Sequence, residues 1–281
     1  MSRGLGDVYK RQFKIKDLRK KILYTFFALI VVRIGCQLPV PGVDASVITD
    51  FFDSQKSLDF FNQLTGGSFS TMSIFALNIT PYITASIIIQ LLTIAIPKLE
   101  ELHKDGEEGR KKLAEYTRYL TIALSVIESA AMAIGFGQQG YLTDGVTFTS
   151  VAVFVVSLTA GSAFLMWLGE QITEKGVGNG ISIVLLINIV SRIPSDMTKL
   201  YESFMKGKII AKALLSGVII AAIIVGVVIL VIILNGAERR IPVQYSKKMQ
   251  GRKMMGGQSS HIPLKVNTAG VIPVIFASSI M

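Results

Sequence analysis

Cysteine and histidine are scarce in this chain, so the residues that most often bind metals or activate nucleophiles are nearly missing. The single cysteine, Cys36, excludes an internal disulfide and a cluster of thiolate metal ligands. The two histidines, His103 and His261, lie in separate basic segments, and the sequence has no His-Glu-x-x-His pair, phosphate-binding loop or nucleophile-elbow serine. We therefore expect no enzymatic activity, no cofactor and no metal site.

Charged residues are also few, at 17% of the 281 positions, whereas hydrophobic residues make up 51%. With a mean hydropathy of +0.53, the chain is too apolar for an ordinary soluble domain of this length. A membrane-spanning helix needs about 20 mostly apolar residues. The stretches that meet this requirement are residues 22–38, 73–96, 119–135, 148–168 and 209–234. The composition thus predicts an integral membrane protein that crosses the bilayer several times.

A further apolar segment, residues 181–193, is shorter than these stretches. About 12 residues form a helix of roughly 18 Å, which does not cross a hydrocarbon core of about 30 Å. We expect either a tilted or re-entrant piece, or a water-filled vestibule that receives the polar, glycine-rich turn at residues 176–180.

The net charge of +10 is distributed unevenly between the loops. Basic residues are dense before residue 22, between residues 98 and 118 and after residue 238, whereas residues 39–72 contain only Lys56. Because basic loops stay on the cytoplasmic side, the N-terminus is predicted to be cytoplasmic. Residues 192–208 are a local exception, with basic residues on a predicted outer loop. This alternation explains the positive charge without DNA as a partner.

Two predicted spans contain polar residues that lipid does not satisfy. Asn78, Thr80 and Pro81 interrupt the second stretch, and the backbone that Pro81 leaves unpaired should face protein or water. Arg33 is a clear charge inside a predicted span. It either reaches the outer headgroups or faces a cavity or a partner.

The loop at residues 39–72 carries an apolar segment of its own, which is too short to span a membrane. Its apolar residues have helical spacing and are followed by two glycines: Leu58, Phe60, Phe61, Leu64, Gly66 and Gly67. A short helix of this kind must rest on an apolar surface. It either caps the loop or acts as a plug in a funnel.

Two segments are distinctive: residues 76–92 (ALNITPYITASIIIQLL) and residues 167–182 (WLGEQITEKGVGNGIS). The first resembles the second-helix signature of SecY, the family of central subunits of the bacterial protein-conducting channel. The second resembles the signature where the fourth and fifth helices of that family meet. Residues 39–42, 109–112 and 258–273 are also similar to the family. The resemblance covers residues 13–281, whereas residues 1–12 resemble no SecY start and are expected to be non-native or disordered.

The resemblance implies an all-α, polytopic membrane bundle that forms part of a ten-helix channel built from two inverted halves. Residues 13–193 would be the first half, with five helices and a plug at about residues 57–70. Residues 194–281 would be an incomplete second half, with the sixth helix, a basic cytoplasmic loop at residues 235–267 and the start of the seventh helix. We therefore expect the chain to be the front part of a longer protein.

The implied function is a protein-conducting channel for secretion and membrane insertion of unfolded polypeptides in the bacterial inner membrane. SecA or the ribosome would drive it, and SecE, SecG, secretory precursors and membrane lipids would be its other partners. The alternative is a secondary transporter, which also uses broken helices. A transporter needs a buried ion or substrate site, for which the sequence offers Asn78, Thr80 and Asn188 but little buried charge.

The resemblance also assigns roles to individual residues. The pore ring would contain Ile79, Ile83, Ile181, Leu185 and Ile275, with Leu185 replacing the more usual isoleucine. A collar of such side chains forms a dewetted constriction that blocks ions and yields to a passing chain. The lateral gate would include Thr80, Ile87 and Gln90, and partner docking would involve Arg239, Arg240, Arg252 and Lys253. Without the resemblance, each apolar position would be interpreted as lipid or core packing.

Overall fold

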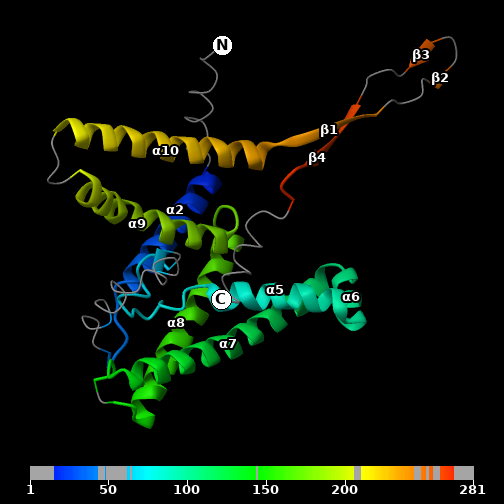
Figure 1. The fold of residues 1–281 in the computed structure, drawn as a ribbon. Coiled ribbons are helices and arrows are strands. Elements are labelled where there is room, and N and C mark those ends of the chain that lie inside the picture. Colours follow the sequence, from blue (N-terminus) through cyan, green and yellow to red (C-terminus); the bar gives the residue numbers. More distant parts are fainter. Residues whose placement is uncertain are drawn as a thin grey trace. The chain divides into compact units, whose positions relative to one another are not determined.

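The computed structural model describes residues 16–43, 48, 62–63, 65–143, 145–205, 210–243, 248–250, 253–255 and 260–268. The named elements within these ranges are, in chain order, the helices α2 (Lys16–Gly35), α5 (Thr80–Ala95), α6 (Pro97–Lys104), α7 (Glu107–Gln138), α8 (Phe148–Lys175), α9 (Gly180–Phe204) and α10 (Ile210–Gly236), then the strands β1 (Glu238–Val243), β2 (Lys248–Gln250), β3 (Lys253–Met255) and β4 (Ser260–Lys265) (Figure 1). The chain divides into two compact units, Met1–Asp196 and Met197–Met281.

Helices α7, α8, α9 and α10 are long and apolar enough to cross a membrane. Helices α5 and α6 would make one more span if they count as a single bent segment. Helix α2 is apolar along most of its length but carries Arg19, Lys20 and Lys21 near its start. These helices confirm the prediction of a polytopic helical membrane protein.

Helix α9 corrects the prediction of a short fifth segment. It runs for 25 residues and contains Pro194, so that it continues well past residue 193. At 1.5 Å per residue this helix measures about 37 Å, which is enough to cross a hydrocarbon core of about 30 Å. The prediction was wrong because the residues after Pro194 are polar and were assigned to a loop, whereas their backbone is helical.

The break in the second apolar stretch lies where the sequence indicates, but Pro81 has a different role. Residues 74–79 form turns, Asn78 has a positive φ of 53°, and α5 begins at Thr80 with Pro81 in its first turn. In the first turn the backbone N–H has no helical partner, so a proline there costs nothing. Pro81 thus starts the helix and does not kink it. The helix ends at Ala95, and α6 leaves at an angle of 103°.

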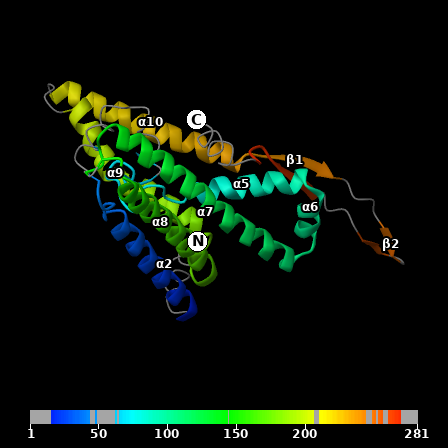
Figure 2. The same cartoon turned by 90° about the horizontal axis from the view of Figure 1, so that it is seen from below.

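The helices of the first unit pack through small residues. Helix α7 buries a stripe spaced by four residues that faces its neighbours: Gly109, Leu113, Thr117, Thr121, Ser125, Ser129, Ala133 and Gly137. Small side chains let membrane helices approach closely, and α7 lies beside α5 and α8 (Figures 1 and 2). The turns at residues 74–79 press equally closely, because a Cβ at Gly161 of α8 would lie 2.0 Å from the Ile74 carbonyl oxygen.

In the second unit, the basic segment after α10 forms paired strands, which the sequence analysis did not predict. Strand β1 pairs antiparallel with β4, with Glu238 opposite Lys265 and Val243 opposite Ser260. Strand β2 pairs in the same way with β3. Each ribbon has two edge strands, and for this reason prolines at positions 242 and 263 are tolerated.

Candidate pore, plug and gate residues

The candidate pore-ring residues lie at the starts of two helices. Ile79 caps α5 and Ile83 follows one turn later, while Ile181 is the second residue of α9. All three belong to one apolar cluster, whose buried members include Ile172 and Val184. Segments about one hundred residues apart in the sequence are therefore brought together.

The candidate ring residues differ in exposure. Ile79 has no exposed surface, whereas Ile83, Ile181 and Leu185 are half-buried. Leu185 lies one turn after Ile181 on the same face of α9. Ile275 lies outside the described residues. Ile79 therefore has the environment of a core residue, and the other three described positions retain surface that can line a path.

A buried amide pair joins the start of α5 to the middle of α9. The Asn188 amide Nδ2 donates to Asn78 Oδ1 over 3.2 Å, and the two side chains are 1% and 2% exposed. These are two of the three polar residues that the sequence offers for a transporter site. They bond to each other, whereas Oδ1 of Asn188 has no hydrogen-bond partner among the described residues. Among the described residues, no group of acidic, histidine or cysteine side chains is arranged to hold a metal ion.

The glycines that end the candidate plug lie directly on α9. Gly66 and Gly67 have φ values of +68° and +89°, a region that favours glycine. A Cβ at Gly66 would lie 2.9 Å from the Asn188 carbonyl oxygen, and a Cβ at Gly67 would lie 2.8 Å from Nη1 of Arg192. At Gly66 a larger residue would collide with the backbone of α9, whereas at Gly67 the flexible end of the Arg192 side chain can move aside. The plug residues Leu58, Phe60, Phe61 and Leu64 lie outside the described residues.

The chain that follows these glycines is buried and held by its own polar groups. Ser70 donates its backbone N–H to Asn62 Oδ1 over 3.2 Å, and its hydroxyl donates to the Gly67 carbonyl over 3.0 Å. Asn62, Thr65 and Ser68 are all buried. The segment is therefore an ordered turn that lies next to α9.

The candidate gate residues share one face of α5. The two fully buried residues of this helix, Pro81 and Ala85, are four apart and lie on one side. The candidate residues Thr80, Ile87 and Gln90 lie on the opposite side, together with Ile83. The less buried face of α5 thus carries both the gate and the ring candidates.

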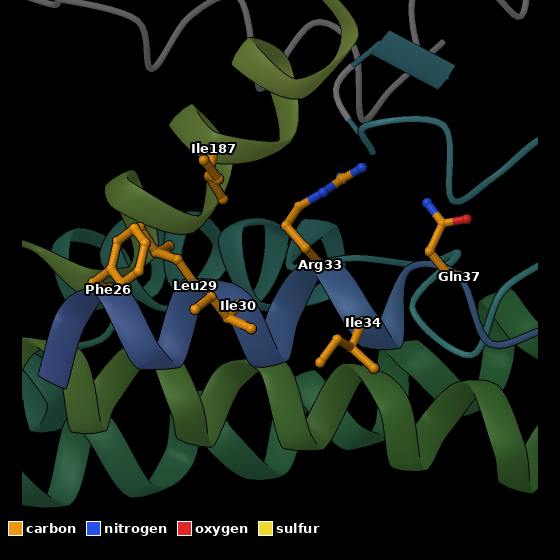
Figure 3. A pocket seen from close by; sticks show the side chains of 7 residues that line it. All are labelled: Phe26, Leu29, Ile30, Arg33, Ile34, Gln37 and Ile187. Carbon is orange, nitrogen blue, oxygen red and sulfur yellow. The ribbon is translucent and has the colours of Figure 1, made fainter. Parts of the chain in front are cut away.

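Arg33 of α2 lines an apolar groove of about 520 Å³ between α2 and α9. Figure 3 shows Arg33 and Ile187, which come from the two helices, on either side of it. Nη1 of Arg33 is buried and has no hydrogen-bond partner in the described part of the chain. Of the two alternatives for this residue, its position against α9 favours the cavity.

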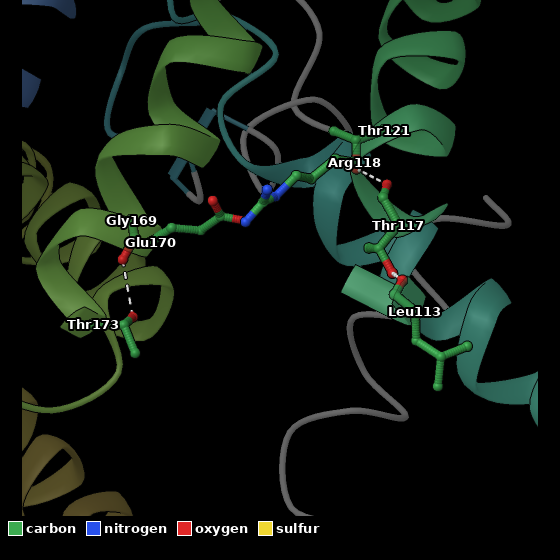
Figure 4. Close-up of polar contacts among 7 residues, drawn as sticks. All are labelled: Leu113, Thr117, Arg118, Thr121, Gly169, Glu170 and Thr173. Carbon is green, nitrogen blue, oxygen red and sulfur yellow. Dashed lines mark hydrogen bonds and ion pairs between the residues drawn. The ribbon is translucent and has the colours of Figure 1, made fainter. Parts of the chain in front are cut away.

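An ion pair between α7 and α8 lies close to the candidate ring. Arg118 Nε donates to Glu170 Oε1 over 2.8 Å (Figure 4). The pair borders a polar hollow of about 310 Å³ that Tyr82 and Ile181 also line. This contact was not predicted from the sequence, because Arg118 was assigned to a basic loop. The feature of the sequence that could have indicated this contact is that Arg118 and Glu170, which carry opposite charges, each lie within a turn or two of an apolar helix segment.

The candidate docking arginines Arg239 and Arg240 lie on β1, in the ribbon that it forms with β4. Arg239 is opposite Leu264 and Arg240 is opposite Pro263, and both arginines are exposed. Successive side chains of a strand point to opposite faces, so the two arginines face in different directions. Lys253 begins β3 opposite Gln250, and Arg252 lies outside the described residues.

Comparison with known proteins identifies the relatives of this chain. The family model described as SecY matches residues 73–281. The protein translocase subunit SecY of Halalkalibacterium halodurans is 46% identical over 274 residues, which are 95% of this chain and 63% of that protein. The protein of the same name from Escherichia coli is 46% identical over 94% of this chain and 60% of that protein. The chain thus spans about three fifths of the length of these relatives.

Solved structures with a similar fold are channels. A protein-conducting channel matches with a TM-score of 0.61 and 20% identity, over 94% of this chain and 56% of that chain. Sec61 in the canine ribosome–channel complex from the endoplasmic reticulum matches with a TM-score of 0.57 and 20% identity, over the same shares of the two chains. At these identities the similarity concerns the fold, and it confirms the predicted class.

Proposed function

The chain belongs to the SecY family, and from this premise we propose that its full-length protein is a channel through which unfolded polypeptides cross or enter the membrane. The named relatives are subunits of a protein translocase. The observation that carries the proposal is the meeting of Ile79, Ile83 and Ile181, from two broken segments, in one apolar cluster.

The constriction is formed by half-buried branched side chains at the starts of α5 and α9. Ile83, Ile181 and Leu185 line it, Ile275 completes it from the seventh helix, and Ile79 supports it from the core. Branched aliphatic side chains suit this role, because a narrow apolar collar expels water and blocks ions. They also yield to a passing chain without forming specific hydrogen bonds.

The plug closes this constriction from the outer side. Residues at about 57–70 act as the plug, and Gly66 and Gly67 are its hinge. The close approach of these glycines to Asn188 and Arg192 supports this role, since it brings the end of the plug onto the helix that carries Ile181. Thr80, Ile87 and Gln90 form one side of the lateral gate.

The partners of the full-length protein follow from its charge and its family. Exposed arginines on the ribbon suit phosphates of ribosomal RNA or an acidic surface of SecA. The Sec61 relative was solved in a ribosome–channel complex, which supports the ribosome as one partner. SecE and SecG complete the translocase. The protein lies in the bacterial inner membrane with a cytoplasmic N-terminus, catalyses no covalent chemistry and needs no cofactor.

A secondary transporter is the weaker alternative, because the sequence offers little buried charge for an ion or substrate site and the Asn188 amide Nδ2 is used in a hydrogen bond to Asn78. Vesicles that contain the full-length protein with its partners would separate the two functions. A channel protects an unfolded secretory precursor from external protease. Uptake of small labelled solutes without protection of the precursor would contradict the channel.

A further inference from the structure

The turn between α8 and α9 is tied to α2 by a hydroxyl group. Thr25 Oγ1 of α2 accepts a hydrogen bond from the Val177 backbone N–H over 3.1 Å. The same oxygen donates to the Lys21 carbonyl over 3.0 Å. A threonine hydroxyl has one proton to donate, and here that proton is used inside α2 while a lone pair holds the turn. The contact joins residues 152 positions apart.

Gly176 makes this contact possible. It is buried, and a Cβ at this position would lie 2.5 Å from Thr25 Oγ1 and 2.5 Å from the Ile172 carbonyl oxygen. A methyl group there would displace the Thr25 hydroxyl from the next amide. The glycine is thus required by the close approach of α2.

A second hydroxyl holds the other end of the turn. Thr173 Oγ1 accepts from the Gly180 N–H over 2.9 Å and donates to the Gly169 carbonyl over 2.9 Å. A Cβ at Gly180 would lie 2.0 Å from the Gly169 carbonyl oxygen, so the backbones of α8 and α9 touch here. The turn is therefore fixed on one side to α2 and on the other to α8.

The start of α9 follows directly from this turn. Asn179 Oδ1 accepts from the N–H groups of Ile181 and Ser182 over 3.1 and 3.3 Å, as a helix cap does. The Ile181 side chain packs onto Gly169, where a Cβ would lie 3.2 Å from its Cγ1 atom. A shift of the turn therefore moves Ile181.

We propose that Thr25 is a positioning residue for the constriction. Its hydroxyl fixes the α8–α9 turn to α2, and in this way it sets the position of Ile181 and, one turn later, of Leu185. The inference rests on the proposed function, which assigns these two residues to the constriction. Helix α2 then acts as a support for the constriction.

The test uses the full-length protein in its complex, with ion leak through the idle channel as the readout. Thr25→Val keeps the shape and removes the hydroxyl, whereas Thr25→Ser keeps the hydroxyl. One partly exposed hydrogen bond shifts a two-state equilibrium by roughly two- to fivefold. We expect Thr25→Val to raise the leak by about that factor, Gly176→Ala to do the same, and Thr25→Ser to match the wild type.

Thr93→Val is the matched control, because the Thr93 hydroxyl bonds to the Gln90 carbonyl within α5 itself. It should leave the leak unchanged. Equal leak from Thr25→Val and Thr25→Ser would overturn the proposal, since packing would then explain the effect. A tight Thr25→Val channel beside a leaky Ile181→Asn channel would overturn it while the proposed function stands. If Ile181→Asn is also tight, the constriction itself is wrongly assigned.

Discussion

Replacing Ile83 with asparagine should have a different effect from replacing Ile79, because we assign Ile83 to the constriction and Ile79 to the core. Ile79 is fully buried in the apolar cluster, so Ile79→Asn loses an aliphatic side chain and buries an unpaired amide. These two effects together cost about 3–6 kcal/mol. Ile83 is half-buried and lies on the less buried face of α5, so Ile83→Asn should cost less than half of that.

The two variants should therefore fail in different ways. Thermal unfolding of the purified full-length complex should show a large loss of stability for Ile79→Asn and a small loss for Ile83→Asn. Ion leak and export of precursors with defective signal sequences should rise clearly for Ile83→Asn. Ile83→Val, which keeps an apolar branched side chain, should behave as the wild type. Equal losses of stability for both variants, with no leak from Ile83→Asn, would refute the reasoning.

Four further substitutions test the rest of the site. Gly66→Val should raise the leak, because an L-residue at positive φ costs about 1–2 kcal/mol and its side chain would clash with Asn188; an unchanged leak would remove Gly66 from the plug hinge. Asn188→Leu should lower the thermal stability of the complex by about 0.5–2 kcal/mol through loss of the bond to Asn78, whereas equal stability would show that the pair is not structural. Arg240→Glu and Arg239→Glu should each weaken ribosome or SecA binding. Each should also lower the slope of log affinity against log salt concentration by about one. If both variants bind normally, the docking assignment is wrong.

The membrane helices were predictable because an apolar run long enough to span a bilayer has few alternatives. Residues 119–135 and 148–168 lie inside α7 and α8, and the structure only adds polar turns at their ends. The same reasoning failed for α9, since hydropathy does not report a helix that continues past Pro194 into polar sequence. Pro81 was misjudged for a related reason: its effect depends on whether it lies in the first turn or inside a helix.

The site depended on other signals. The local sequence marked Asn78 and Gly176 as breaks in apolar segments, but only the family resemblance placed the two breaks in one site. The structure adds the hydrogen bond between Asn78 and α9. The paired strands at residues 238–265 were missed because strand pairing depends on contacts between distant residues, and the basic composition of this segment does not indicate them. The contact between Arg118 and Glu170 was missed because it joins two helices whose charges lie 52 positions apart.

Photocrosslinking from the constriction tests whether a translocating polypeptide passes Ile83. A photoreactive residue at position 83 of the full-length protein, with a secretory precursor arrested during export, should form adducts with the precursor. The same residue at position 127, on the strongly exposed side of α7, is the control and should label lipid or partner subunits. The account predicts precursor adducts from position 83 and none from position 127. Precursor adducts absent from position 83 while export proceeds would contradict it.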